Sequence, residues 1–207
     1  GFIGIGGMGN GNLGSFIGFP EVQGLAVCDV DTKKRNAAQA KVEKKYSHEK
    51  ESGNYKGCDA YVDFRELTAR KDIDAVMIAT PDHTHAVIAM PAMQLGKHVF
   101  CQKPLAHTVY EARMLKEAAR KYKVQTQMGN QGHSSEAIRL MKEWIAAGAI
   151  GDVTEVHAWS DRPDKGPWYA NFAARELPKD TPEVPKHLDW DLWQGPAKER
   201  PYHPAYH

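Results

Sequence analysis

The chain has 207 residues, enough for one large domain or for one domain and part of a second. Hydrophobic residues make up 42% and charged residues 26% of it, which is typical of soluble globular proteins. The 27 Lys and Arg residues nearly balance the 26 Asp and Glu residues and form no basic block, which argues against nucleic acid as the main partner. No apolar stretch approaches the roughly 20 residues of a membrane helix, so we expect no membrane partner.

Short apolar runs alternate with longer helical patterns along the first 150 residues. The runs are bounded by polar or turn-forming residues and predict strands. They are Phe2–Ile5, Gly24–Cys28, Ala75–Ala79, His98–Cys101 and Val124–Gln127. The predicted helices are Asp31–Lys45, His85–Leu95, Thr108–Lys121 and Ser135–Ala147. Thr108 and Glu111 form a capping box, and Pro91 is expected to kink or restart its helix. This alternation predicts an α/β fold with a parallel sheet.

The pattern changes near residue 150. Residues Val153–Trp159 alternate like a half-exposed strand. Eight of the twelve prolines fall in the last 57 residues, so this part is either an elaborate functional loop or the start of a second domain. We interpret its four tryptophans as packing anchors or subunit contacts rather than site residues. They are Trp159, Trp168, Trp190 and Trp193.

A G-x-G-x-x-G motif stands at Gly4, Gly6 and Gly9. It follows a predicted strand and opens a predicted helix. In a dinucleotide-binding turn, the first glycine makes the tight turn, the second lets the backbone reach a pyrophosphate, and the third allows close packing. The motif therefore predicts a nucleotide site that includes Gly7 and Met8, although a glycine-rich loop without a ligand is the alternative.

Asp29 lies 20 residues after Gly9, at the end of the next predicted strand. An acid there accepts hydrogen bonds from the adenosine ribose hydroxyls, so it favours NAD over NADP as the cofactor. NADP stays open as an alternative because Lys33, Lys34 and Arg35 could form a phosphate site. A solvated helix face is the more ordinary interpretation of these three cations.

Polar residues follow three further predicted strands, where ligands bind in open parallel sheets. The candidate cofactor contacts among them are Thr80, Pro81, His83, Gln102, Lys103, Asn130 and Gln131. His85 could reach the cofactor or the substrate, or it could only pack, while Asp82 or Thr84 could cap the next helix. The two histidines lack further ligands at suitable spacing, so we expect no metal site.

Four stretches together resemble the Gfo/Idh/MocA oxidoreductase family, the relatives of glucose–fructose oxidoreductase and inositol dehydrogenases. They are GIGGMG at 4–9, VCDVD at 27–31, ATPDHTHAVIAMPAMQLGKHVFCQKPLA at 79–106 and TQMGNQGHS at 126–134. The resemblance implies a Rossmann NAD(P)-binding domain over residues 1–129. It also implies an α+β open-sheet domain, of which residues 130–207 would be the incomplete start, and a homo-oligomer when full length.

The family's Glu-Lys-Pro element corresponds to Gln102, Lys103 and Pro104. The resemblance implies that Lys103 meets the substrate hydroxyl beside the nicotinamide, and we place His85 with it as a second catalytic candidate. Gln102 departs from the family's glutamate, which preserves hydrogen bonding but removes a charge beside the lysine. The family's later histidine and aspartate motif has no counterpart here. Since the chain also begins without methionine, we expect a fragment cut at both ends.

The expected function is an NAD(P)-dependent oxidoreductase. It would transfer a hydride between the nicotinamide and a hydroxyl-bearing carbon of a small sugar, cyclitol or derivative. One alternative is an NAD-dependent glycosidase or lyase that acts through transient oxidation of the sugar. Another is a non-catalytic NAD-binding fragment. The three scattered cysteines suit a reducing compartment, so we expect a cytoplasmic protein, with an export signal left open by the incomplete N-terminus.

Overall fold

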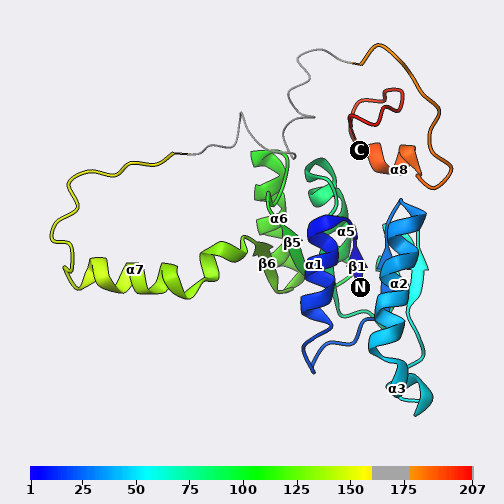
Figure 1. Ribbon diagram of the computed structural model, residues 1–207, viewed down its shortest axis with the longest axis horizontal. Helices are drawn as coiled ribbons and strands as arrows, with labels where there is room; N and C mark the ends of the chain where they lie inside the picture. The colour runs from blue at the N-terminus through cyan, green and yellow to red at the C-terminus, as the bar shows by residue number, and fades with distance from the viewer. Residues whose placement is uncertain (160–177, 207) are drawn as a thin grey trace. The chain divides into compact units, whose positions relative to one another are not determined.

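The computed structural model describes residues 1–159 and 178–206, and its centre is a parallel sheet (Figure 1). The strand order is β3-β2-β1-β4-β5-β6, and every neighbouring pair is parallel. The strands are β1 (Phe2–Ile3), β2 (Ala26–Cys28), β3 (Asp59–Tyr61), β4 (Ala75–Ile78), β5 (His98–Gln102) and β6 (Thr126–Gly129). The predicted parallel α/β sheet is confirmed. Strand β3 was not predicted, because its three residues contain no apolar run.

Helices precede or follow these strands along the chain (Figure 1). They are α1 (Gly7–Phe16), α2 (Thr32–Lys45), α3 (Ser47–Glu51), α4 (Phe64–Thr68), α5 (His85–Gln94), α6 (Val109–Tyr122), α7 (Glu136–Ala146) and α8 (Trp190–Gln194), with short 3-10 turns at η1 (Asp82–Thr84) and η2 (Gln131–Ser134). The capping box of Thr108 and Glu111 is confirmed. Helix α5 continues through Pro91, so the predicted restart is wrong. The carbonyl that loses its donor there belongs to Val87, which lies on the exposed side of the helix.

Two hydrophobic clusters cover the two faces of the sheet. Successive strand residues point to opposite faces, so Phe2 joins one cluster and Ile3 the other. The cluster with Phe2 contains residues of α1 and α2, whereas the cluster with Ile3 contains residues of α4, α5 and α6. The structure is therefore a doubly wound sheet with helices on both faces.

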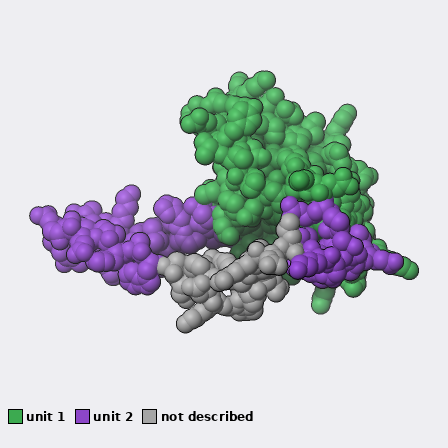
Figure 2. All heavy atoms as spheres, turned by 90° about the horizontal axis from the view of Figure 1, so that it is seen from above, with its two compact units in different colours: residues 1–129, 185–199 green, residues 130–184, 200–207 purple. Residues whose placement is uncertain are grey.

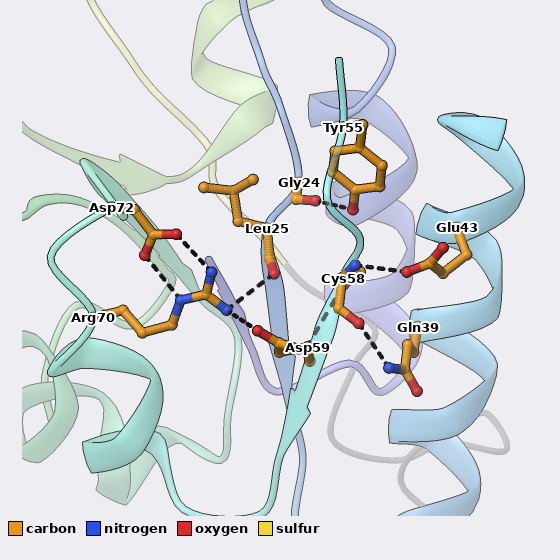
Figure 3. Close-up of polar contacts among 9 residues, drawn as sticks. All are labelled: Gly24, Leu25, Gln39, Glu43, Tyr55, Cys58, Asp59, Arg70 and Asp72. Carbon is orange, nitrogen blue, oxygen red and sulfur yellow. Dashed lines mark hydrogen bonds and ion pairs between the residues drawn. The ribbon is translucent and has the colours of Figure 1, made fainter. Parts of the chain in front are cut away.

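Polar contacts fix the edge formed by β2 and β3 (Figure 3). The Arg70 guanidinium donates to the carboxylates of Asp59 at 2.6 Å and Asp72 at 2.7 Å. From α2, the Glu43 carboxylate accepts a 2.6 Å hydrogen bond from the N–H of Cys58, just before β3. The Glu43 contact ties α2 to the residue before β3, and the Arg70 contacts join the start of β3 to the segment that follows α4.

The chain divides into two compact units (Figure 2). The first comprises residues 1–129 and 185–199, and the second comprises residues 130–184 and 200–207. The predicted boundary between residues 129 and 130 coincides with a change of unit. Residues 185–199, which the prediction gave to the second domain, group with the first unit instead. No helix among the described residues is long and apolar enough to cross a bilayer.

The proline-rich part departs from two predictions. Residues 153–159 form no strand and pair with no other described segment, and Val156 is 80% exposed. A strand needs a hydrogen-bonding neighbour, and none of the described residues supplies one. Trp190 is buried and stacks on Trp193 with ring centroids 4.8 Å apart, as predicted for packing anchors. Trp159 is 87% exposed and is no packing anchor among the residues that the structure describes, which leaves its predicted subunit contact untested, and Trp168 lies outside those residues.

Candidate functional site

The candidate site lies at the carboxyl end of β1, where the strand order reverses between β2 and β4. The chain leaves β1 through Gly4, whose φ of +80° favours glycine. A Cβ atom on Gly4 would lie 2.6 Å from the backbone nitrogen of Thr80. One on Gly9 would lie 1.9 Å from the carbonyl oxygen of Gly4. Both glycines are therefore required by close backbone packing.

Gly6 and Gly7 differ from these two. A Cβ atom on either would have no atom within 4 Å. Gly6 also has an ordinary φ of −70° and is the N-cap of α1, with no side chain capping the helix. Close packing therefore does not require glycine at these two positions. Because they carry no side chains, the backbone at the N-terminus of α1 is accessible, and a helix N-terminus attracts anions. Met8, in the first turn of the helix, is 56% exposed.

Asp29 connects this turn to β2. Its carboxylate accepts a 2.7 Å hydrogen bond from the N–H of Ile5 and a 2.9 Å hydrogen bond from the N–H of Asp31. The side chain is largely buried, yet each carboxylate oxygen keeps a further lone pair. Asp29 can therefore hold the glycine turn and still accept a hydrogen bond from a hydroxyl group of a ligand.

The loop after β4 carries three of the predicted site residues, Thr80, Pro81 and His83. The hydroxyl oxygen of Thr80 is buried without a hydrogen-bond partner, and Pro81 follows it. The Nε2 atom of His83 lies 3.2 Å from the carbonyl oxygen of Trp193. Thr84 occupies the N-cap position of α5, as one of the two predicted alternatives had it, but its side chain donates to the Pro81 carbonyl and makes no capping hydrogen bond to the helix.

His85 is enclosed rather than open to the crevice, with 1% of its surface exposed. Its Nδ1 atom lies 2.6 Å from the carbonyl oxygen of Pro104, and its Nε2 atom lies 2.8 Å from that of Thr80. The ring thus joins the loop after β4 to the loop after β5. This geometry favours a positioning role for His85 over the catalytic role that we expected from the sequence.

Gln102 ends β5 and Lys103 follows it, and the two side chains lie in different environments. Gln102 is buried, and its Oε1 atom accepts a 3.2 Å hydrogen bond from the N–H of Lys103. Its Nε2 atom is buried without a partner. The side chain packs against Gly129, where a Cβ atom would lie 2.6 Å from the Gln102 Cδ atom. Lys103 is exposed and is joined to Pro104 by a cis peptide bond.

Two predicted residues belong to the second unit. Asn130 precedes η2 and Gln131 begins it, directly after β6 in the chain. Among the described residues, no three His, Cys, Asp or Glu side chains are arranged to hold a metal ion. A hollow of about 750 Å³ is lined by residues at the amino ends of β1, β4 and β5, such as Gly1, Ala75 and His98, so it is distinct from this site.

Sequence reasoning missed two contributors to the site. Because Gly129 has no side chain, the Gln102 side chain can pack against its backbone. The only feature of the sequence that could have indicated this contact was a glycine just after the predicted strand Val124–Gln127. Residues 185–199 also reach the site, through the contact of His83 with Trp193 and a hydrogen bond from Asp189 to Val30. Nothing in the local sequence indicates that a segment more than 100 residues away returns to these strands.

The residues present suit a dinucleotide. The open backbone of Gly6 and Gly7 can receive a pyrophosphate, and Asp29 can receive a ribose hydroxyl. The partnerless buried atoms of Thr80 and Gln102 lie at the ends of the two neighbouring strands β4 and β5. Buried polar atoms without partners are uncommon in proteins and often mark places where a ligand or water completes the hydrogen bonding.

Comparisons with known proteins agree with this arrangement. Residues 1–130 match the model of the Gfo/Idh/MocA group, described as an oxidoreductase family with an NAD-binding Rossmann fold. Levoglucosan dehydrogenase from Pseudarthrobacter phenanthrenivorans is 36% identical over 107 residues, which cover 49% of this chain and 27% of that protein. An α-N-acetylgalactosaminidase from Shewanella oneidensis is 32% identical over 159 residues, covering 74% of this chain and 32% of that protein.

A solved structure shows the same fold. It is scyllo-inositol dehydrogenase from Lactobacillus casei with bound NAD(H) and scyllo-inositol, which matches with a TM-score of 0.60 and 22% identity. The match covers 73% of this chain and 42% of that protein. The chain thus spans between about a quarter and a third of the length of the two curated relatives and less than half of this structure.

Proposed function

This chain belongs to the Gfo/Idh/MocA oxidoreductase family, and we propose that it provides the nucleotide-binding part of an NAD-dependent dehydrogenase. The reaction is hydride transfer between the nicotinamide and a hydroxyl-bearing carbon of a sugar, cyclitol or derivative. The observation that carries the proposal is the open, uncapped backbone of Gly6 and Gly7 beside Asp29. The two named dehydrogenases, for levoglucosan and scyllo-inositol, support a polyhydroxylated substrate.

In this proposal the bound nicotinamide supplies the hydride acceptor, and the chain positions it and manages charge and protons. The exposed ammonium group of Lys103 donates a hydrogen bond to the reacting hydroxyl oxygen and stabilises its developing negative charge. Gln102 fixes the backbone of that lysine through its hydrogen bond to the Lys103 N–H. Because Gln102 is neutral, it holds the lysine in place without adding a negative charge beside it.

The proposed contacts to the rest of the cofactor follow the carboxyl ends of β1, β2, β4 and β6. Gly4, Gly6, Gly7, Met8 and Gly9 receive the pyrophosphate at the N-terminus of α1. Asp29 receives the adenosine ribose, which favours NAD over NADP. Thr80, Pro81 and His83 contact the nicotinamide half from the β4 side. Asn130 and Gln131, which follow β6, remain candidate contacts on the nicotinamide side.

A second candidate function is a glycosidase that oxidises its sugar transiently and restores NAD in each turnover. The 32% identity to an α-N-acetylgalactosaminidase over 159 residues favours it. The two reactions differ in their products. Accumulation of NADH with a free polyol identifies the dehydrogenase, whereas release of a sugar from a glycoside without net NADH identifies the glycosidase.

We also propose a reducing, cytoplasmic location and assembly into a homo-oligomer. The cysteines Cys28, Cys58 and Cys101 are all free and buried. Burial raises the pKa of the Cys58 and Cys101 thiols to about 12, so they stay protonated and unreactive. Such thiols suit a compartment in which disulfides do not form. The oligomer is supported only by the resemblance to the family.

Calorimetric titration with NAD and then NADP tests the proposal. Gly6→Ala places a methyl group in the open space above the turn without a clash, so it should weaken NAD binding by at least about tenfold while the fold persists. Gly11→Ala, also free of contacts but further along α1, is the matched control and should leave NAD affinity unchanged. Binding of neither cofactor by a folded chain, or equal binding by all three proteins, would contradict the proposal.

A further inference from the structure

The first turn of α2 follows Asp29 directly and offers the place where a ribose 2′-phosphate would be bound. In doubly wound folds, the acid at the end of the second strand meets the ribose 2′-hydroxyl, and cationic or amide groups just beyond it accommodate the 2′-phosphate of NADP. Here those groups are the backbone and side chains of Thr32, Lys33, Lys34 and Arg35. Whether they are free decides which cofactor fits.

The N–H groups of this turn are already occupied. Thr32 donates a 2.8 Å hydrogen bond to the carbonyl oxygen of His187. Lys33 and Lys34 donate to the Asp31 carboxylate at 2.8 and 3.3 Å. Free N–H groups make a helix N-terminus an anion site, and these three are taken by a neighbouring carbonyl and by an acid. A phosphate would have to displace both.

His187 belongs to residues 185–199, which we call the returning segment. Its near end is fixed by an antiparallel bridge between Asp31 and Leu188 and by a 3.0 Å hydrogen bond from the N–H of Asp189 to the Val30 carbonyl. Leu188 and Trp190 are both buried. The returning segment is therefore anchored to the end of β2.

Its far end lies against the loop after β4. The carbonyl of Trp193 is 3.2 Å from the His83 Nε2 atom, and a Cβ atom on Gly195 would lie 3.0 Å from the Thr84 methyl group. The returning segment thus contacts the residues on both sides of the reversal point at β1. Contacts at two separate strand ends hold it in one place beside the candidate site.

Two charged side chains of this turn already have partners as well. The Arg35 guanidinium donates to the Asp29 carbonyl at 3.1 Å and to the Thr32 hydroxyl at 3.4 Å. The Lys34 ammonium lies 3.7 Å from the Asp31 carboxylate. Asp29 and Asp31 place two largely buried carboxylates at this position. A 2′-phosphate would meet two negative charges, with two of the three neighbouring cations already engaged.

We propose that the returning segment is a specificity-determining element that closes the 2′-phosphate position and restricts the site to NAD. This inference rests on the proposed function. It differs from the role of Asp29 because it assigns part of the selectivity to residues that are distant in the chain. Its consequence is that loosening the returning segment should admit NADP without harming NAD binding.

Titrations with NAD and NADP on the wild type, Leu188→Gly and Leu188→Gly/Trp190→Gly test the inference. The glycines remove the two buried anchors, and faster trypsin cleavage after Lys186 reports release of the returning segment. Ala197→Gly, at an exposed position of the same segment, is the matched control. We expect NADP affinity to rise about tenfold in the released variants, while NAD affinity changes less than about threefold.

The outcomes separate the inference from the proposed function. An unchanged NAD-to-NADP ratio in a released variant overturns the inference alone, as does a wild type that binds both cofactors equally. Loss of both cofactors from a released variant also overturns it, because the segment would then support binding in general. A folded wild type that binds neither cofactor overturns the proposed function and the inference together.

Discussion

The carboxylate of Asp29 accepts a 2.7 Å hydrogen bond from the N–H of Ile5, so the acid at the end of β2 holds the turn that follows β1. The two residues are 24 positions apart in the chain and meet because their strands are parallel neighbours. One side chain thereby supports the glycine turn and faces the proposed ribose position. Its replacement should affect folding as well as binding.

Asp29→Ala should lower the free energy of unfolding by about 2–4 kcal/mol, because two buried N–H groups lose their acceptor. Asp29→Asn keeps one acceptor oxygen and should cost about half as much. Urea unfolding of both variants measures the difference. If Asp29→Ala is as stable as the wild type, the carboxylate does not support the turn as the structure indicates.

The two kinds of glycine in the motif should respond differently to alanine. Gly9→Ala forces a methyl group to within 1.9 Å of the Gly4 oxygen and should destabilise the protein by more than about 2 kcal/mol. Gly11→Ala meets no atom and should stabilise α1 by about 0.5–1 kcal/mol. Thermal melts of the two variants compare them directly, and equal melting temperatures would contradict the packing argument.

His85→Ala should destabilise the protein by about 2–4 kcal/mol, since it removes the ring N–H that donates to a loop carbonyl and opens a cavity. His107→Ala, at an exposed histidine nearby, should change stability by less than about 0.5 kcal/mol. Chemical denaturation measures both. A His85→Ala protein with wild-type stability but no turnover would contradict the positioning role and support a catalytic role for His85.

Lys103→Ala should leave stability within about 0.5 kcal/mol of the wild type, because the side chain is exposed. NAD affinity should change little, whereas the turnover of a polyol substrate by an active enzyme should fall at least about a hundredfold. Calorimetry and NADH absorbance separate the two effects. Full turnover in the variant would remove Lys103 from the proposed chemistry.

Asp31 should make part of the stability dependent on pH. Burial acts to raise the pKa of its carboxyl, but hydrogen bonds from the Lys33 and Lys34 N–H groups, together with the charges of Lys34 and His187, outweigh burial and lower that pKa below its usual value. Its contribution is therefore complete above the unfolded pKa of about 3.9 and is lost as the pH falls through the lower folded value.

Asp31→Asn keeps an N-cap oxygen but cannot titrate. Between pH 5 and the acid limit of folding, the melting temperature of the wild type should therefore fall more steeply than that of the variant. Parallel curves for the two proteins would show that the Asp31 carboxyl does not titrate differently in the folded and unfolded chains.

The sequence by itself determined the parallel α/β architecture, the glycine turn and the acid that ends β2. These features are local: apolar runs bounded by turn residues predict buried strands, and Gly4 and Asp29 stand at fixed distances from strand ends. The same locality explains the error at residues 153–159. Alternation predicts a strand there, but a strand exists only if a neighbour pairs with it.

Only the tertiary structure decided where His85 points and what reaches the end of β2. The ring of His85 is enclosed between the carbonyl oxygens of Pro104 and Thr80 and does not open on the crevice. The returning segment pairs Leu188 with Asp31, 157 positions earlier, through backbone hydrogen bonds that almost any residue can make. Such contacts leave no local pattern in the sequence because they depend on where the chain travels, not on which residues carry them.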